Sequence, residues 1–324
     1  MQTRKLGYSD LHLTTIGLGT WAMGGGDWKF GWGPQDDQAS IKAVHAALDQ
    51  GINWIDTAAI YGHGHAEEVV AKAIKGIRDS VIIATKCGRV WEGDSREIGK
   101  SLKADSIRQE VESSLQRLNI DVIDLYQIHW PEPDEEIEEG WSALSELIRE
   151  GKIRYGGVSN FSVEQLKRAQ AIHPIASLQP PYSMLRREIE EGIVAYCREN
   201  QIGIVAYSPM QAGLLTGKFT KERSANLPES DWRSRNPMFN EPQLSVNLQA
   251  IDQLREIADA RGISLAQLSL AWVLRLEEMT SAIVGARKPQ QIEETAQAGD
   301  IQLTPTEIDG IEEILAWRTS MVQE

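Results

Sequence analysis

Residues 81–86 read Val-Ile-Ile-Ala-Thr-Lys, a short apolar run that ends on a charged side chain. Such runs, rich in β-branched residues and bounded by polar ones, are typical of strands buried on both faces of a parallel sheet. Seven further segments share this character. The predicted strands are Thr15–Leu18, Trp54–Asp56, Val81–Thr85, Val122–Ile128, Ile153–Val158, Ser177–Gln179, Ile204–Tyr207 and Ala282–Val284.

Longer segments with helical periodicity separate these runs. In the first of them, Ile41, Val44 and Leu48 recur at intervals of three or four residues, which places them on one face of a helix. Ser162, with Gln165 three residues later, forms a typical helix start. The predicted helices are Asp37–Gln50, Ser106–Leu118, Ile137–Glu150, Val163–Ala171, Glu188–Asn200, Leu248–Arg261, Leu265–Arg275, Pro289–Ala298 and Pro305–Ala316.

Alternation of this kind without a break in composition favours an α/β fold, a (β/α)8 TIM barrel formed by residues 1–324 as one domain. A barrel core takes about 250 residues, so the chain has more residues than the core needs. We assign these residues to a β-hairpin formed by Arg4–Leu6 and Leu11–Leu13, to a long loop with little regular structure over Ser208–Pro242, and to an additional helix in the seventh unit.

Composition excludes several classes of protein. A chain of 324 residues with 41% hydrophobic content can bury a large core, and a net charge of −14 argues against nucleic acids or anionic membranes as partners. Two cysteines form neither a disulfide scaffold nor a zinc motif. Because no apolar run approaches about 18 residues and the first residues do not resemble a signal peptide, we expect a cytoplasmic protein with no membrane segment.

Several of the predicted strands end at a polar side chain. Asp56, Lys86 and His129 end three successive strands, and Tyr61 lies in the loop just past Asp56. In a barrel of this type the active site forms at the carboxyl ends of the strands, so these groups should converge. Further strand-end or adjacent candidates are Ser159, Asn160, Gln179 and Tyr207.

The first four residues form a chemically coherent group. A tyrosine is a poor acid at neutral pH, and a neighbouring ammonium lowers its pKa by favouring phenolate. A buried ammonium in turn needs a carboxylate. Asp56 can therefore keep Lys86 charged, Lys86 can tune Tyr61, and Tyr61 can protonate a developing alkoxide while His129 orients it. This set suits carbonyl reduction.

The same residues lie in motifs that resemble those of the aldo-keto reductase superfamily over essentially the whole chain. These motifs are Ile16-Gly17-Leu18-Gly19-Thr20-Trp21, Ile55-Asp56-Thr57-Ala58 with Tyr61-Gly62, Ala84-Thr85-Lys86, Leu125-Tyr126-Gln127-Ile128-His129, Gly157-Val158-Ser159-Asn160-Phe161, Tyr207-Ser208-Pro209 and Ile283-Val284-Gly285-Ala286-Arg287. The chain looks most similar to bacterial reductases with a long loop after the seventh strand. The resemblance implies that Asp56, Tyr61, Lys86 and His129 form a catalytic tetrad.

The resemblance also implies an NADPH/NADP+ site at the barrel mouth. Ser159, Asn160 and Gln179 would hold the nicotinamide carboxamide, and Tyr207 would stack on the ring. The implied pyrophosphate residues are Ser208, Pro209, Met210, Gly213, Leu215, Gly217 and Lys218; those at the adenosine end are Gly285, Arg287, Gln291, Glu294 and Thr295; and Gly19, Thr20, Trp21 and Asp56 complete the site. Arg287 and Lys288 precede a predicted helix, where a 2′-phosphate would meet two cations and a helix N-terminus.

Tryptophan accounts for 10 of the 21 aromatic residues, which indicates an aromatic wall around a small carbonyl or alcohol substrate. We expect Trp21, Trp91 and Trp130 to form it with Tyr61 and His129; Trp28 is a weaker candidate. The predicted function is reversible reduction of aldehydes and ketones by NADPH. The sequence leaves open the physiological substrate, the preferred direction and the oligomeric state.

Four alternatives compete with this interpretation. Gly17-Leu18-Gly19-Thr20-Trp21-Ala22 matches a dinucleotide-binding fingerprint, but the glycines that follow cannot open the helix which that motif requires. His63 and His65 could suggest a metal pair, yet no third ligand stands at a telling spacing, so we expect no metal. Lys86 could form a Schiff base. A redox-sensing NADPH-binding regulatory subunit with little turnover is the rival from another functional class.

Overall fold

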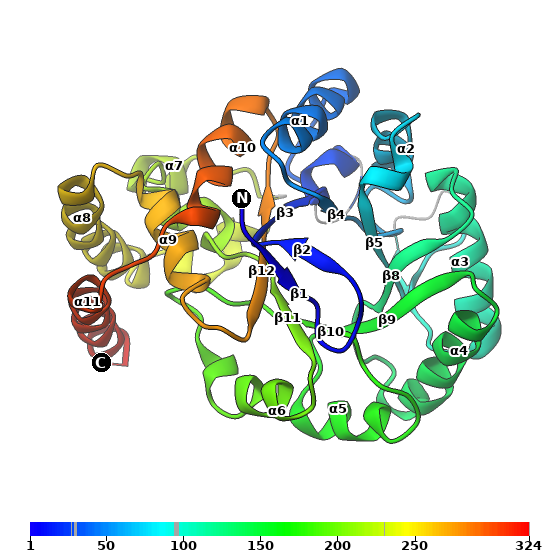
Figure 1. The fold of residues 1–324 in the computed structure, drawn as a ribbon. Helices are drawn as coiled ribbons and strands as arrows, with labels where there is room; N and C mark the ends of the chain where they lie inside the picture. Colours follow the sequence, from blue (N-terminus) through cyan, green and yellow to red (C-terminus); the bar gives the residue numbers. More distant parts are fainter. Residues whose placement is uncertain (27, 29–30, 94–96, 230, 324) are drawn as a thin grey trace.

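The computed structural model describes residues 1–26, 28, 31–93, 97–229 and 231–323. Its centre is a closed barrel of eight parallel strands (Figure 1), which confirms the predicted (β/α)8 architecture. In spatial order the strands are β10 (Ser177–Gln179), β11 (Gly203–Ala206), β12 (Met279–Gly285), β3 (Ile16–Gly19), β4 (Trp54–Asp56), β5 (Ile82–Cys87), β8 (Ile123–Ile128) and β9 (Ile153–Ser159).

Helices surround the barrel, and several of them begin at side-chain caps that the sequence offers. The Asp36 side chain accepts from the Ala39 N–H, and Ser162 forms a capping box with Gln165. The surrounding helices are α1 (Asp37–Asp49), α2 (His65–Ala73), α3 (Ala104–Leu118), α4 (Ile137–Arg149), α5 (Val163–Gln170), α6 (Ile193–Glu199), α9 (Leu265–Val273) and α10 (Pro289–Ala296). Helix α2 was not predicted, because it is short and starts after Gly64, whose left-handed backbone is a poor start signal.

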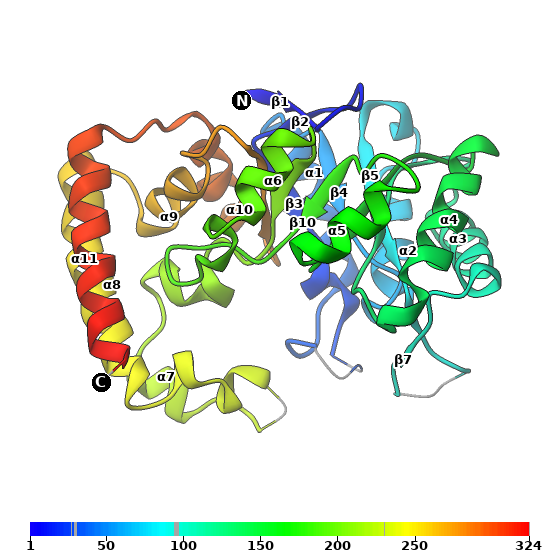
Figure 2. The same cartoon turned by 90° about the horizontal axis from the view of Figure 1, so that it is seen from below.

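The predicted N-terminal hairpin is present. It consists of β1 (Thr3–Lys5) and β2 (His12–Thr14), paired antiparallel. Leu6, Leu11 and Leu13 are fully or almost fully buried against the apolar interior of the barrel, which they close at the amino ends of the strands. Figure 2 shows this hairpin at one end of the barrel and α7 (Lys221–Ala225) at the other. The mouth at the carboxyl ends is therefore the open end.

The segment 208–242 differs from the expectation of a loop with little regular structure. Besides α7 it contains three 3-10 helices, η5 (Gln211–Thr216), η6 (Trp232–Arg235) and η7 (Pro237–Phe239). Side-chain caps from Thr220, Asp231 and Asn236 start these short turns, and Phe219 and Phe239 pack edge to face beneath them. Single turns of this length carry no periodicity, so hydrophobic patterning cannot predict them.

The surplus helix of the seventh unit is also confirmed. α8 (Gln243–Arg261) lies beside α11 (Pro305–Gln323) at the edge of the molecule in both views (Figures 1 and 2). Both helices are longer than predicted, and the buried Arg318 side chain donates to Asn247 across the pair. No helix among the described residues is both long and apolar enough to cross a membrane.

A small residue on β3 is required by the barrel packing. A Cβ placed on Gly17 would lie 2.1 Å from the indole of Trp54. That indole is completely buried and is fixed by hydrogen bonds to the Thr14 carbonyl and to Ser281. The ring therefore has no room to move aside.

We predict that Gly17→Ala lowers the free energy of unfolding by about 1–3 kcal/mol, the usual cost of overpacking a core. Chemical denaturation monitored by circular dichroism would measure it. Gly285→Ala is the matched control, because a Cβ at that strand position meets no atom within 4 Å. Equal stability of the two variants would contradict the packing argument.

Candidate active site

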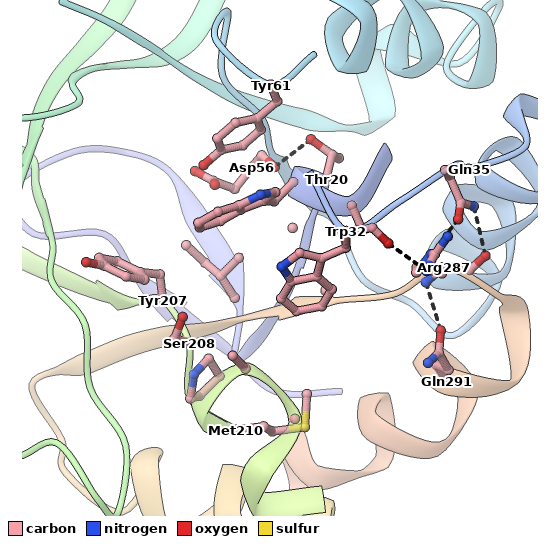
Figure 3. A pocket seen from close by; sticks show the side chains of 18 of the residues that line it. Thr20, Trp32, Gln35, Asp56, Tyr61, Tyr207, Ser208, Met210, Arg287 and Gln291 are labelled. Atoms are coloured by element: carbon pink, nitrogen blue, oxygen red, sulfur yellow. Dashed lines mark hydrogen bonds between the residues drawn. The ribbon is translucent and has the colours of Figure 1, made fainter. Parts of the chain in front are cut away.

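Four side chains predicted to act together meet at the mouth of the barrel. Lys86, at the end of β5, donates to the Asp56 carboxylate at 2.7 Å, to the Thr57 carbonyl at 2.8 Å and to the Tyr61 hydroxyl at 3.3 Å. The rings of Tyr61 and His129 meet edge to face with centroids 5.9 Å apart. Asp56 and Tyr61 lie together at one end of the cavity in Figure 3.

Two glutamines support this group, Gln127 from β8, which neighbours β5, and Gln179 from β10, which lies opposite β4 in the barrel order. The Gln179 amide donates to the second Asp56 oxygen at 2.8 Å, and Gln127 approaches the same oxygen at 3.5 Å. The Lys86 side chain is 0% exposed and that of Asp56 is 4% exposed. A buried ion pair is tolerated only when its remaining hydrogen-bonding capacity is met, which these contacts achieve. Gln127 was not predicted, because it lies within a strand and not at its end.

Burial controls the protonation of the group. It raises the pKa of Tyr61 well above its ordinary value, and the Asp56 charge acts in the same direction. Burial also lowers the pKa of Lys86, while the charge of Asp56 and its hydrogen bond oppose that fall. The sequence analysis expected Lys86 to lower the pKa of Tyr61. The structure gives the opposite direction, because apolar surroundings and the Asp56 carboxylate outweigh the ammonium.

His129 is held in its neutral form. Burial is the main cause that lowers its pKa well below 6.5, and the positive charges of Lys86 and Arg89 add to the effect. Its backbone carbonyl accepts a hydrogen bond from the Asn160 side chain at 3.0 Å. A neutral imidazole at this position can donate to, or accept from, an oxygen atom in the cavity.

The residues predicted for the nicotinamide form a connected network. Tyr207 donates through its hydroxyl to the Asn160 side-chain carbonyl at 2.9 Å, and Ser159 donates to the Gln179 carbonyl at 2.7 Å. Asn160 and Ser208 both have left-handed backbones, with φ of 65° and 53°. These side chains thus lie together on the wall of the mouth next to the Asp56–Lys86 pair.

A cavity of about 1010 Å³ extends from this network to α10. It is lined by most of the predicted site residues: Gly19, Thr20, Trp21, Asp56, Tyr61, His129, Trp130, Ser159, Asn160, Gln179, Tyr207, Ser208, Pro209, Met210, Gly213, Lys218, Gly285, Arg287, Gln291, Glu294 and Thr295. Figure 3 shows Tyr207, Ser208 and Met210 on one side and Arg287 with Gln291 at the far end.

Four predicted residues lie outside the cavity lining. Lys86 is buried beneath Tyr61, and Leu215 is fully buried behind the wall. Gly217 has a left-handed backbone, and its carbonyl accepts from Arg255. Trp91 packs against the ring of His63 and beneath the Arg117 guanidinium. The structure therefore does not bring Trp91 to the aromatic wall; Trp28 lies there instead, with its ring centroid 5.9 Å from that of Tyr61.

The alternatives based on other motifs find no support in the geometry. The His65 ring contacts Asp37, whereas His63 faces Trp91. Within the described ranges, no three His, Cys, Asp or Glu side chains gather as metal ligands would. Gly17 and Gly19 belong to a barrel strand followed by one short 3-10 turn, Trp21–Gly24, so the Rossmann interpretation is wrong.

Several lining residues were not predicted. The Arg287 guanidinium donates to the Gln35 side chain at 2.7 Å and to the Pro34 carbonyl, which ties the loop after β3 to the start of α10. Trp32 of that loop lies under the Arg233 guanidinium, 5.0 Å from the ring centroid. The loop has neither helical nor strand periodicity, so no local pattern places it over the cavity. Other unpredicted lining residues are Arg89, Ile98 and Arg223.

The cavity suits a long anionic ligand such as a dinucleotide. Two buried indole N–H groups in its lining, those of Trp32 and Trp232, have no hydrogen-bond partner among the residues that the structure describes. A Cβ on Gly213 or Gly285 would meet no atom within 4 Å, so the backbone is open to close approach there. Lys218, Arg287 and Lys288 add positive charge. Unpaired donors, accessible backbone and cations are what phosphate and amide groups need.

Two relatives cover nearly the full chain. Aldo-keto reductase YhdN of Bacillus subtilis (strain 168) is 43% identical over 296 residues, 90% of this chain and 87% of its own. NADH-specific methylglyoxal reductase of Escherichia coli (strain K12) is 36% identical over 318 residues, 94% of this chain and 95% of its own.

Solved structures of similar proteins superpose on nearly the whole chain. Glycerol dehydrogenase AKR11B4 from Gluconobacter oxydans superposes with a TM-score of 0.89 at 38% identity and covers 98% of this chain and 96% of its own. An aldo/keto reductase from Klebsiella pneumoniae, solved in complex with NADP and acetate, superposes with a TM-score of 0.75 at 28% identity, with coverage of 97% and 96%. The model of the Aldo/keto reductase family matches residues 15–316. The chain therefore belongs to the aldo/keto reductase family of oxidoreductases.

Proposed function

We propose that this chain reduces aldehydes and ketones with NADPH, and oxidises the corresponding alcohols in reverse, with Tyr61 as the general acid. One observation carries the proposal: the Tyr61 hydroxyl lies 3.3 Å from the buried Lys86 ammonium and beside His129, at the floor of a cavity large enough for a dinucleotide and a substrate.

Each residue of the tetrad has a distinct task. Asp56 keeps the Lys86 ammonium charged against the cost of burial. The ammonium fixes the Tyr61 hydroxyl and stabilises negative charge that appears on it when it gives up its proton. Neutral His129 orients the carbonyl oxygen by a hydrogen bond. The stacked indole of Trp21, 5.9 Å from the Tyr61 ring, excludes water from the same side.

A bound nicotinamide supplies the hydride that the carbonyl carbon receives. Asn160, Ser159 and Gln179 offer the amide and hydroxyl groups that would hold its carboxamide, and Tyr207 offers a ring to stack on it. The unpaired indole N–H groups of Trp32 and Trp232 lie along the channel and would donate to phosphate or amide oxygens.

NADPH is favoured over NADH by the cations at the far end. Arg287 lies where α10 begins, and Lys288 is its N-terminal flanking residue, so a 2′-phosphate would find both charges there. Since one relative is described as NADH-specific and one related structure contains NADP, the family accommodates either cofactor. The preference therefore rests on this chain's own residues.

Tyr61→Phe is the direct test of the general acid. It removes the proton donor but keeps the ring, so kcat for NADPH-dependent reduction of 4-nitrobenzaldehyde should fall about 10²- to 10⁴-fold. The Kd for NADPH, measured by fluorescence, should be unchanged. Tyr155→Phe, which alters a ring near the hairpin end of the barrel, is the matched control.

The result also separates the two functional classes. If the wild-type chain binds NADPH tightly but turns over no reactive aldehyde, the enzyme proposal fails and a regulatory role is supported. If Tyr61→Phe retains full turnover, the proton comes from another group.

The pH profile provides a second test. The general acid must be protonated, and the pKa of Tyr61 lies well above 10; His129 must be neutral, and its pKa lies well below 6.5. Neither group changes its charge between these limits. We therefore expect kcat/KM for reduction to be flat from about pH 6.5 to about pH 9.

One buried carboxyl needs its own control in this experiment. Burial raises the pKa of Glu110 to about 7, and Glu110 accepts from the Gly88 N–H behind the site. Any inflection near neutral pH should therefore disappear in Glu110→Gln. An inflection that persists in that variant would contradict the assignment of Tyr61 and His129.

Arg287→Ala tests the cofactor preference. Loss of a charge-assisted hydrogen bond to phosphate should lower kcat/KM with NADPH about 10- to 100-fold and change kcat/KM with NADH much less. Steady-state kinetics with both cofactors would measure the ratio. Arg198→Ala removes the same charge from the exposed face of α6 and serves as control. An unchanged ratio in Arg287→Ala would refute the phosphate role.

A further inference from the structure

Arg89 lines the cavity on the side of His129 and Trp130, away from the cations at α10. Arg89 is the first residue of the short strand β6 (Arg89–Val90), which pairs with β7 (Gly99–Lys100). Its side chain is 13% exposed and lines the cavity together with Ile98, His129 and Trp130. In Figure 2, β7 lies at the end of the barrel opposite β1 and β2, which is the end of the mouth.

Two partners hold the Arg89 guanidinium in place. Its guanidinium donates to the Glu132 carboxylate at 2.7 Å and lies 5.7 Å from the centroid of the Trp130 ring. Glu132 also pairs with Lys100 at 2.9 Å. Neither Glu132 nor Lys100 is among the described residues that line the cavity. Arg89 thus lines the cavity while its guanidinium is held by Glu132, which lies outside the lining, and by Trp130, which belongs to it.

Among the described residues of this cluster, the cations outnumber the carboxylates with which they pair. Two cations, Arg89 and Lys100, share one carboxylate, and Glu132 is itself 40% exposed to solvent, which weakens its charge. The field of Arg89 reaches the tetrad, because it contributes to the low pKa of His129. The lining also includes four aromatic residues, Trp21, Trp28, Tyr61 and Trp130.

We propose that Arg89 determines substrate specificity, and that the preferred carbonyl substrate carries a carboxylate on a small apolar or aromatic frame. The inference rests on the proposed reductase function and adds the substrate class to it. The aromatic walls would contact the frame, His129 and Tyr61 the carbonyl oxygen, and Arg89 the carboxylate. A guanidinium is the side chain best matched to a carboxylate, since its parallel N–H groups form paired hydrogen bonds.

The test compares substrates of equal shape and different charge. The pairs are 2-, 3- and 4-carboxybenzaldehyde and the corresponding formylbenzamides, reduced with saturating NADPH. For at least one isomer, the wild-type chain should show a higher kcat/KM for the carboxylate than for the amide. In Arg89→Met, which keeps an unbranched apolar side chain beside Trp130, that ratio should fall about 10- to 100-fold. Arg89→Lys should restore part of it.

Lys100→Met is the matched control. It removes a cation from the same Glu132 cluster, but from outside the cavity, so the ratio should stay close to that of the wild type. An equal loss in Lys100→Met and Arg89→Met would indicate a general effect of surface charge and overturn the proposal. So would an equal fall of kcat/KM for carboxylate and amide in Arg89→Met, or the absence of any preference for a carboxylate in the wild type.

A binding measurement separates this inference from the proposed function. Benzoate and benzamide are titrated against the NADPH-bound chain and detected by quenching of the tryptophan fluorescence from the cavity wall. We expect tighter binding of benzoate, and loss of that preference in Arg89→Met but not in Lys100→Met. If no carbonyl compound is reduced but this pattern holds, the reductase proposal fails and the anion site stands. If benzoate binds no better than benzamide, the anion site is refuted.

Discussion

The buried ion pair between Lys86 and Asp56 is the constraint on which the rest of the site depends. An ammonium with a fully buried side chain is stable only beside a carboxylate whose other oxygen is also occupied. Gln179 supplies that second contact, and the Thr57 carbonyl completes the coordination of the ammonium. Three strands from distant parts of the sequence, β4, β5 and β10, must therefore be in register. A closed barrel provides this register, because all its strands end at one mouth.

The two ends of the barrel have different roles: side chains at the amino ends of the strands stabilise the fold, and those at the carboxyl ends form the site. At the amino ends of the strands, the hairpin leucines and Trp54 form a packed apolar cluster. A Cβ added to Gly17 has no space in it. At the carboxyl ends, polar side chains border an open cavity. Ile283 belongs both to the apolar cluster and to the cavity lining, so the two regions are continuous. Rigidity at the closed end holds the ion pair in place at the open end.

The regular parts of this structure could be predicted from sequence and the irregular parts could not. Eight apolar runs located the strands, and their polar last residues located Asp56, Lys86 and Gln179. Loops lack periodicity, so no local pattern predicted the hydrogen bond between Arg287 and Gln35 or the contact of the Arg233 guanidinium with the Trp32 ring. For the same reason Trp91 was expected at the aromatic wall that Trp28 occupies. The pKa of Tyr61 was misjudged because it depends on burial, which composition does not reveal.

The charge of the cavity lining differs from the charge of the whole chain. The chain carries a net charge of −14, yet the described part of the cavity is lined by six basic residues: Arg89, Lys218, Arg223, Arg233, Arg287 and Lys288. All six lie on the segments that follow β5, β11 and β12, at the same end of the barrel as the tetrad. A local cationic surface within an acidic protein attracts anions to the mouth and repels them elsewhere. The net charge of the chain therefore does not describe the mouth, where the segments after the strands set the local charge.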